Sequence, residues 1–273
     1  MTAKRLLIAG CGDLGERLGA RLAPDQWQIT GLRRHPQHLP AGIHAMAADL
    51  TDPGTLAPLA SEQFDAVVFQ ATPPAREPAA YRRIYVDGLA NLLDRVQTNR
   101  LLFVSSTAVY GQQHGEWVDE QSPTEPAAFN GRILLEAEQL AHRAGGIAVR
   151  FSGIYGPGRE RLVEGVRQGR LRCRQQPPEW TNRIHADDCA GVLAHLLALP
   201  EPASIYCASD SQPATRCEVM DWLADRLSVE RPERDTSHTS AGQGKRVDNR
   251  RLRASGYHFD YPDYRSGYGA LLI

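Results

Sequence analysis

Three glycines near the start of the chain, Gly10, Gly12 and Gly15, have the spacing of a loop that holds phosphate groups. In such a loop the first glycine permits a tight turn and the second lets a pyrophosphate approach the backbone. The third lets the following helix pack closely on the preceding strand. The phosphates contact unpaired N–H groups at the positive end of the helix dipole. The spacing therefore predicts a dinucleotide site, in which Asp13 and Leu14 complete the loop.

The residues on either side of the loop belong to elements that would position it. Residues 6–9 form an apolar run typical of a buried strand, since a parallel sheet covered on both faces needs continuous hydrophobic residues. Leu14, Leu18 and Leu22 have the spacing of a helix that packs back on this strand. This strand–turn–helix context favours a dinucleotide site over an ordinary glycine-rich turn.

Further apolar runs, bounded by turn residues, predict more buried strands. They span residues 27–32, 43–47, 66–69 and 101–104, and a long helix over 79–97 precedes the last of them. Strand and helix alternate at short intervals, which predicts an α/β fold with a Rossmann-type doubly wound parallel sheet. In such a sheet, ligands bind outside the carboxyl ends of the strands.

The end of the second strand bears on the choice of cofactor. An acidic residue at this point would bind the free 2′-hydroxyl of NAD. The chain instead has Arg33 and Arg34, whose planar guanidinium groups suit the 2′-phosphate of NADP. The alternative is a pair of solvated loop arginines in an arginine-rich chain. We favour NADP, with NAD as the other possibility.

Two more strand ends are expected to contact the cofactor. Asp49, followed by Leu50, ends the third strand and would bond the adenine amine, unless it is an ordinary acid beside a helix. Ala71 and Thr72 follow the fourth strand and precede two prolines at positions 73–74. Because proline bars regular structure, this loop should cross the cofactor at the carboxyl edge of the sheet.

Composition limits the classes of partner. The net charge of −1 argues against a nucleic acid or a membrane surface, and a small-molecule substrate is expected. The five cysteines are scattered without a CxxC pair, which predicts a reducing compartment and no structural metal. No signal peptide precedes the first strand, and the apolar run at 192–199 is too short to span a bilayer. We expect a cytoplasmic protein.

The sequence SSTAVYG at residues 105–111 resembles the extended short-chain dehydrogenases/reductases, which include nucleotide-sugar epimerases and dehydratases. Later segments strengthen the resemblance. Residues 150–158 are similar to the family's sixth strand and YGPG loop, and 184–188 to its IHxxD segment. Residues 247–252 are similar to its closing helix, so the resemblance extends over the whole chain.

The resemblance implies a division of the chain. The dinucleotide-binding core should comprise residues 1–151, completed by segments near 184–207, where the chain crosses back into the sheet around Ile184 and Ile205. Residues 152–273 should mainly form a small C-terminal substrate lobe, because the family inserts its substrate segments after the later strands.

Catalysis in this family uses a Ser or Thr with a Tyr and a Lys in a YxxxK pattern. Ser106 matches the first position. One alignment of the following helix places Phe129 and Ile133 at the Tyr and Lys positions, and another places Asn130 and Leu134 there. Neither alignment supplies the pair, so the chain resembles the atypical subgroups that lack it.

A displaced proton donor would have to replace the missing tyrosine. Tyr155 in the YGPG loop is our first choice, and Tyr85, which stands where the family often has asparagine, is the second. Either tyrosine could instead be a packing residue. Thr181 replaces an arginine that clamps the diphosphate of nucleotide sugars, although Arg183 is close, and this weakens a nucleotide-sugar assignment. We interpret His185 as structural.

Two hypotheses about function follow. The first is an NAD(P)-dependent oxidoreductase or epimerase/dehydratase-like enzyme that acts on an unidentified small molecule. The alternative is a non-catalytic NADP-binding module or nicotinamide sensor. Retention of Ser106 and the YGPG loop favours the enzyme. The family habit also suggests a homodimer through the helices around 79–97 and 132–143, and no metal is expected.

Overall fold

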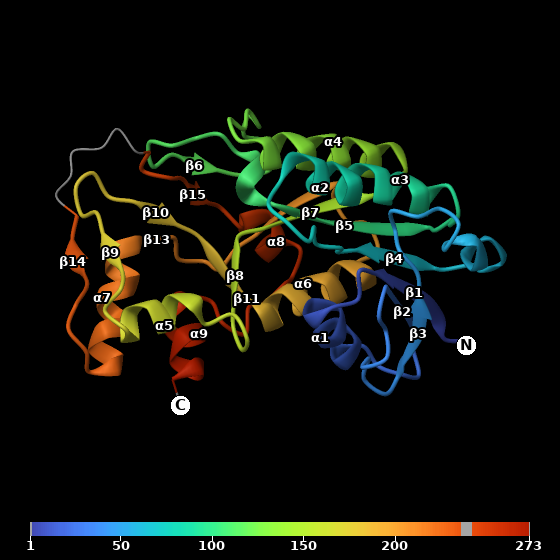
Figure 1. Cartoon of the computed structure of the whole chain (residues 1–273), viewed down its shortest axis with the longest axis horizontal. Coiled ribbons are helices and arrows are strands. Elements are labelled where there is room, and N and C mark those ends of the chain that lie inside the picture. Colours follow the sequence, from blue (N-terminus) through green and yellow to red (C-terminus); the bar gives the residue numbers. More distant parts are fainter. Residues whose placement is uncertain (1, 236–241, 273) are drawn as a thin grey trace. The chain divides into compact units, whose positions relative to one another are not determined.

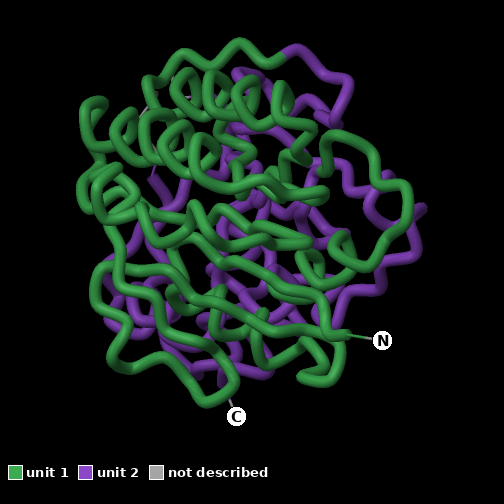
Figure 2. Tube along the Cα trace, turned by 90° about the vertical axis from the view of Figure 1, so that its right-hand side faces the viewer, with its two compact units in different colours: residues 1–109, 124–150, 190–206 green, residues 110–123, 151–189, 207–273 purple. Residues whose placement is uncertain are grey.

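The computed structural model describes residues 2–235 and 242–272, which form two compact units (Figure 2). Unit 1 comprises residues 1–109, 124–150 and 190–206, and unit 2 comprises 110–123, 151–189 and 207–273. Both units are therefore assembled from separate stretches of the chain. The segment 110–123, expected in the core, belongs to unit 2.

A seven-stranded parallel sheet organises unit 1, in the order β12-β7-β5-β4-β1-β2-β3. Its strands are β1 (Lys4–Ala9), β2 (Trp27–Arg33), β3 (Ile43–Ala47), β4 (Ala66–Phe69), β5 (Arg100–Ser106), β7 (Ile147–Phe151) and β12 (Ile205–Ala208). Ile8 lies opposite Gly31 of β2 and Val68 of β4. Because the strand order reverses beside β1, the crevice that binds ligands in such folds lies at the carboxyl end of this strand. The predicted doubly wound α/β fold is confirmed.

Helices cover both faces of this sheet. They are α1 (Asp13–Arg21), α2 (Pro78–Arg82), α3 (Gly88–Leu93), α4 (Phe129–Arg143) and α6 (Ala186–Ala198), with short turns η1 (Ala57–Ser61), η2 (Arg83–Asp87) and η3 (Thr107–Val109). Figure 1 shows α2, α3 and α4 on one face and α1 and α6 on the other. The single helix predicted over 79–97 is interrupted, because η2 is a π turn between α2 and α3.

A buried ion pair ties α4 to the sheet. Arg150 on β7 donates to Glu138 of α4 at 2.6 Å, and both side chains are almost completely buried. The Ser105 hydroxyl on β5 donates to the same carboxylate at 2.5 Å. Burial of either charge without a partner would be unfavourable, but the hydrogen bonds between the two groups compensate for the lost solvation.

Unit 2 consists of short strand pairs and helices. Its strands are β6 (Trp117–Val118), β8 (Gly153–Tyr155), β9 (Arg172–Cys173), β10 (Trp180–Thr181), β11 (Arg183–His185), β13 (Ala214–Thr215), β14 (Glu233–Arg234) and β15 (Arg246–Val247). Its helices are α5 (Arg161–Arg167), α7 (Arg216–Leu227), α8 (Arg250–Ala254) and α9 (Tyr264–Leu271). Contrary to expectation, Ile184 does not enter the large sheet, since the described strand β11 pairs with β8 in a separate two-stranded sheet. Ile205, by contrast, begins β12 of the large sheet.

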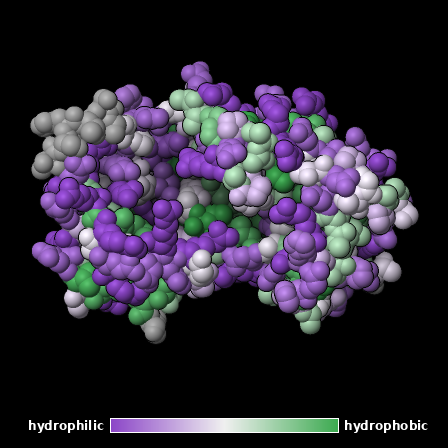
Figure 3. Space-filling model, in the orientation of Figure 1, coloured by the Kyte–Doolittle hydropathy of each residue, from purple (hydrophilic) through white to green (hydrophobic). Residues whose placement is uncertain are grey.

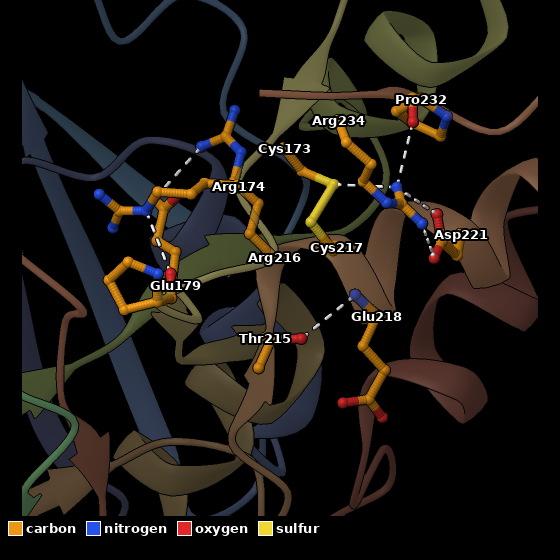
Figure 4. Close-up of a disulfide and its surroundings, with 11 residues drawn as sticks. Cys173, Arg174, Glu179, Thr215, Arg216, Cys217, Glu218, Asp221, Pro232 and Arg234 are labelled. Atoms are coloured by element: carbon orange, nitrogen blue, oxygen red, sulfur yellow. Dashed lines mark hydrogen bonds and ion pairs between the residues drawn. A yellow bond between two sulfur atoms is a disulfide. The ribbon is translucent and has the colours of Figure 1, made fainter. Parts of the chain in front are cut away.

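A disulfide links Cys173 of β9 to Cys217 of α7 (Figure 4). The two cysteines are 44 residues apart and have no motif spacing, so only their packing brings them together. Arg234 Nη1 lies 3.2 Å from the Cys173 sulfur and is held by Asp221 (Figure 4). The Cys173–Cys217 disulfide opposes our expectation of a reducing compartment, because disulfides persist mainly in oxidising compartments.

The surface agrees with the balanced composition. Hydrophilic side chains predominate on the face drawn in Figure 3. Among the described residues, Trp117 of unit 2 is the one large hydrophobic residue that is exposed. No helix within residues 2–235 and 242–272 is long and apolar enough to cross a membrane.

Candidate functional site

A cavity of about 580 Å³ lies in unit 1 at the carboxyl ends of its strands. Its lining comes from the turns that follow β1, β2, β3 and β4, and from α2 and the start of η2. This is the edge at which doubly wound sheets bind nucleotides. Its volume is within the range of small-molecule and cofactor sites.

The glycine loop forms one wall of this cavity. Gly10 has a φ of +83°, and a Cβ there would lie 2.4 Å from the Ala71 Cα, so only glycine fits. A Cβ built at Gly12 meets no atom of the described residues within 4 Å. Among the described residues, no side chain forms a capping hydrogen bond at the start of α1. The open space and the uncapped helix terminus fit a bound phosphate group.

Eight of the predicted cofactor residues line the cavity, namely Gly10, Gly12, Arg33, Arg34, Asp49, Leu50, Ala71 and Thr72. Three others do not. Asp13 is engaged by Arg17 at 2.8 Å, Leu14 is half-buried, and Gly15 is buried in the contact between α1 and the sheet. A Cβ at Gly15 would lie 2.4 Å from Gln70 Nε2, so this glycine has the packing role predicted for it.

The charged residues that line the cavity are Arg33 and Arg34 after β2, Asp49 after β3, Glu77 before α2 and Arg83 in η2. Arg33 donates to the Cys11 carbonyl and to Glu16, each at 3.2 Å. Hydrogen bonds from Thr51 hold the pKa of Asp49 below its usual range, and the charges of Arg34 and Arg83 lower it further. Sequence reasoning missed Arg83 because it expected a regular helix at this point.

Ser106 lies at the end of β5, also in unit 1. Its hydroxyl oxygen accepts a hydrogen bond from the Ala108 N–H at 3.2 Å, which leaves its hydrogen available for donation. A Cβ at Gly131 would lie 2.4 Å from the Ala108 carbonyl oxygen, so α4 packs closely against η3. The next residue toward the helix start, Asn130, has a buried Oδ1 with no hydrogen-bond partner among the described residues.

In neither alignment does the helix α4 have an ionisable side chain at the position of the family's tyrosine or lysine. Ile133 and Leu134, the two possible lysine positions, are buried apolar residues of α4. Phe129, one possible tyrosine position, packs edge-on against Tyr81 with ring centroids 5.3 Å apart. The α4 helix therefore supplies apolar packing and one amide where the family has its acid and base.

Tyr85 belongs to a chain of aromatic rings in unit 1. Its ring centroid is 5.5 Å from that of Tyr81 and 6.2 Å from that of Phe103. Burial raises the pKa of Tyr85 to about 12, so its phenol keeps its proton at neutral pH. Tyr85 lies within the π turn η2, and such turns recur at functional sites.

Tyr155 lies in the interior of unit 2. Its side chain is only 4% exposed, and its hydroxyl has no partner among the described residues. The ring lies against Tyr268 and His185, at 4.3 and 5.3 Å, and a Cβ at Gly267 would come within 1.8 Å of its oxygen. Burial raises its pKa well above the usual range. These contacts are those of a packing residue and disfavour Tyr155 as the proton donor.

The IHxxD segment is part of the same interior. Asp188 accepts hydrogen bonds from the Tyr257 hydroxyl at 2.8 Å and from the N–H groups of Asp260 and Tyr261 at 2.8 and 2.9 Å. The His185 ring lies 4.0 Å from the Tyr261 ring. This geometry agrees with a structural role for His185, and Asp188 joins the C-terminal segment to the start of α6.

Fold and cavity together define a Rossmann-type dinucleotide-binding protein. Residues 6–205 match the model of the NAD dependent epimerase/dehydratase family, and the chain belongs to this family. The predicted resemblance to extended short-chain dehydrogenases/reductases is confirmed.

Three similar proteins can be compared with the chain over nearly its whole length. Protein YeeZ of Escherichia coli K12 is 30% identical, covering 95% of this chain and 97% of its own. A Streptomyces protein named 3-diazoavenalumate denitrifying reductase is 25% identical, covering 97% and 99%. A solved structure from Methylobacillus flagellatus, named as a candidate NAD-dependent epimerase/dehydratase, is 40% identical with a TM-score of 0.84, covering 98% and 97%.

More distant structures of the same fold contain bound NAD or NADPH. These neighbours share the fold of this chain, and the match to an NAD dependent family supports a nicotinamide cofactor.

Proposed function

We propose that this protein is an NADP(H)-dependent oxidoreductase of the reductase type, acting on a small molecule. The cavity of unit 1 carries the proposal. It combines an open position beside Gly12 with arginines at the carboxyl end of β2. These features match the pyrophosphate and the 2′-phosphate of NADP(H).

A nicotinamide cofactor bound there would donate or accept a hydride. The chain itself would contribute a hydrogen bond from the Ser106 hydroxyl that orients the substrate against the cofactor. Tyr85, which keeps its proton at neutral pH, would supply that proton where the substrate needs one. Without a nearby lysine to lower its pKa, Tyr85 is a weaker acid than the missing family tyrosine.

This weak acid favours substrates that need little proton donation. A group that already carries positive charge, such as an iminium or a diazonium, becomes neutral when it accepts a hydride and requires no proton from the protein. The Streptomyces relative whose name describes the reduction of a diazo compound supports this class. The missing family tyrosine and lysine argue against ordinary sugar nucleotides, alcohols and ketones.

Cofactor binding is the first test. Calorimetry with NADPH and NADH should give clear binding in the parent, and Gly12→Val should weaken both by about 100-fold or more because its side chain occupies the pyrophosphate position. Gly269→Val in α9 is the matched control, since a Cβ there also meets no described atom within 4 Å. It should leave binding unchanged. A parent that binds neither cofactor would refute the proposed function.

Turnover is the second test. NADPH oxidation should be followed with a panel that pairs each cationic acceptor with its neutral analogue, in the parent, Ser106→Ala and Tyr85→Phe. We expect activity mainly on the cationic members, with a loss in Ser106→Ala. Robust turnover on neutral ketones that neither substitution changes would place the active site elsewhere.

A second candidate function is a non-catalytic nicotinamide-binding module. The buried apolar side chains of Ile133 and Leu134, where the family has lysine, favour it. It predicts tight NADPH binding with no oxidation of NADPH by any acceptor in the panel.

Partners and location remain proposals. We propose a homodimer through α2, α3 and α4, which sedimentation velocity would test, and no nucleic-acid or membrane partner. Cytoplasmic location stays a prediction, and the Cys173–Cys217 disulfide opposes it. Labelling of free thiols in protein from intact cells would distinguish a reduced pair from an oxidised one.

A further inference from the structure

The disulfide of unit 2 lies beside a fixed guanidinium group (Figure 4). Strand β14 pairs with β9 in a register that places Arg234 opposite Cys173, and the Asp235 N–H donates to the Cys173 carbonyl at 2.9 Å. The Arg234 Nη1 atom lies 3.2 Å from the Cys173 sulfur. The pairing of these two strands therefore keeps a cationic N–H donor at this sulfur.

Helix α7 supplies both the other half of the bond and the group that orients Arg234. Cys217 and Asp221 are four residues apart on α7, so they lie on the same face of the helix. The Asp221 carboxylate accepts from Arg234 Nη1 at 3.0 Å and from its Nη2 at 2.6 Å. This two-bond ion pair fixes the orientation of the guanidinium group and compensates its charge while the disulfide is intact.

The contact between Arg234 and the sulfur gains strength when the disulfide opens. A disulfide sulfur is a weak hydrogen-bond acceptor, whereas a thiolate carries a negative charge and accepts a charge-assisted hydrogen bond. Cys173 and Cys217 belong to the buried core of unit 2, and apolar surroundings by themselves disfavour a thiolate. Arg234 opposes this effect at Cys173, so its position stabilises the open form more than the closed form.

The two sulfur atoms differ in access and in what stabilises them. Cys217, the second residue of α7, is 6% exposed and follows Arg216, whose side chain is 37% exposed, whereas Cys173 is 2% exposed. A nucleophile therefore approaches Cys217 more readily. Exchange is faster when the leaving thiolate is stabilised, and Cys173 is the cysteine beside the arginine. Access and stabilisation of the leaving group favour the same direction of attack.

We propose that Cys173 and Cys217 form a thiol–disulfide exchange site for a small thiol, in which Arg234 stabilises the leaving thiolate. The thiolate of the small molecule attacks the Cys217 sulfur and forms a mixed disulfide, and the S–S bond breaks with its electron pair on Cys173. A second small thiolate then attacks the sulfur of the first, and Cys217 leaves as a thiolate at the start of α7, where the helix dipole is favourable. The two protein thiolates take up the protons that the small thiols release. The protein is reduced by two electrons, and the small thiol is oxidised to its disulfide.

Exchange at this site would couple unit 2 to the thiol balance around the protein. Opening the bond removes a covalent link between β9 and α7 that closes 44 residues of chain. The stability of unit 2 would therefore follow the ratio of small thiol to its disulfide. This inference is independent of the proposed function, since it involves no nicotinamide cofactor.

The place of the mixed disulfide is the first test, and it uses the parent protein. The folded, oxidised chain is exposed to reduced glutathione, quenched with acid, alkylated and digested, and the peptides are identified by mass spectrometry. We expect glutathione first on Cys217, and then free thiols at both positions while the chain stays folded. A first adduct on Cys173 would overturn the proposal, and so would a disulfide that opens only as fast as the protein unfolds in the same buffer.

The role of Arg234 is tested at equilibrium in mixtures of reduced and oxidised glutathione. Arg234→Ala should lower the ratio of dithiol to disulfide by about tenfold, because a hydrogen bond to a charged group is lost from the reduced state. Arg234→Lys should recover part of this loss, since it keeps the charge. Arg231→Ala is the matched control: Arg231 forms a two-bond ion pair with Asp225 of α7, and its loss should leave the ratio unchanged. Equal shifts in Arg234→Ala and Arg231→Ala would overturn the role of Arg234.

A pH profile separates this role from a merely structural one. In Cys217→Ser the Cys173 thiol is free, and its rate of alkylation by iodoacetamide reports the fraction present as thiolate. We expect the midpoint of this profile to lie at lower pH with Arg234 present than after Arg234→Ala in the same background. Coincident profiles would show that Arg234 does not stabilise the thiolate and would overturn the proposal.

Discussion

The two units differ in how many of their interior polar atoms lack a hydrogen-bond partner among the described residues. In unit 1 the buried charges of Glu138 and Arg150 satisfy each other, and the buried side-chain atoms without a partner among the described residues are the amide oxygens of Gln70 and Asn130. In unit 2 the buried atoms without such a partner are more numerous, and they include Tyr155 Oη, Arg183 Nη1 and Asp210 Oδ2.

Exposed polar groups at the cavity and unpartnered polar groups in the interior have different consequences. An exposed cation at a cavity has no desolvation cost in the absence of a ligand, because water solvates it. A buried polar atom without a partner has an energetic cost and affects stability and its dependence on pH. We therefore expect substitutions in the cavity of unit 1 to alter binding, and those in the interior of unit 2 to alter stability.

The largest effect should come from breaking the buried pair of unit 1. Glu138→Ala leaves Arg150 charged in the interior and should lower the free energy of unfolding by about 3–5 kcal/mol, measured by urea denaturation. Glu136→Ala, two residues earlier, breaks an exposed pair and should cost less than about 1 kcal/mol. Equal losses in the two variants would contradict the view that unit 1 has satisfied its interior charges.

Removal of the disulfide should be the next largest effect. Replacing Cys173 and Cys217 by serine opens a loop closed over 44 residues and should lower the free energy of unfolding by about 3–4 kcal/mol. NADPH affinity should not change, because both cysteines belong to unit 2. Thiol titration of the unreduced, unfolded parent should find the three free cysteines, Cys11, Cys189 and Cys207. A titre that includes Cys173 and Cys217 would show that the bond does not form.

A pH-dependent effect should come from Asp210. Burial raises its pKa to about 7, against about 3.9 in an unfolded chain. Between these values the folded state binds the extra proton, so this residue's contribution to stability falls as pH rises and is constant above pH 7. Asp210→Asn should remove a decrease of about 1–3 kcal/mol between pH 5 and 7.5 in urea titrations.

The exposed Asp225, paired with Arg231, provides the control for this experiment. Asp225→Asn should leave the change in stability between these two pH values as it is in the parent. If Asp210→Asn also left it unchanged, the Asp210 carboxyl would be ionised inside unit 2, and a polar partner would have to solvate it there.

The smallest effect should come from Tyr155→Phe. The change removes a buried hydroxyl without a partner among the described residues, so stability should stay within about 0.5 kcal/mol of the parent or rise. Tyr264→Phe, in the same unit, removes a hydroxyl that donates to Glu218 at 3.1 Å and should cost about 1 kcal/mol. Turnover lost in Tyr155→Phe alone would restore Tyr155 as the displaced acid and erase the contrast between the units.

The sequence by itself determined the class of fold and the place of the cavity. Continuous apolar runs and the glycine spacing act over a few residues, so they predict strands, turns and the carboxyl edge where they meet. The same local information showed that Tyr and Lys are missing from the helix at Phe129.

Only the tertiary structure decided which residues of a given type have which role. It paired Cys173 with Cys217, buried Tyr155, kept Ile184 out of the large sheet, and placed Arg83 in the cavity that Arg34 also lines. Each of these outcomes depends on contacts between segments far apart in the chain or, for Arg83, on a π turn that changes the direction of the residues around it. Local periodicity carries no record of such contacts, because they are set by how whole elements pack.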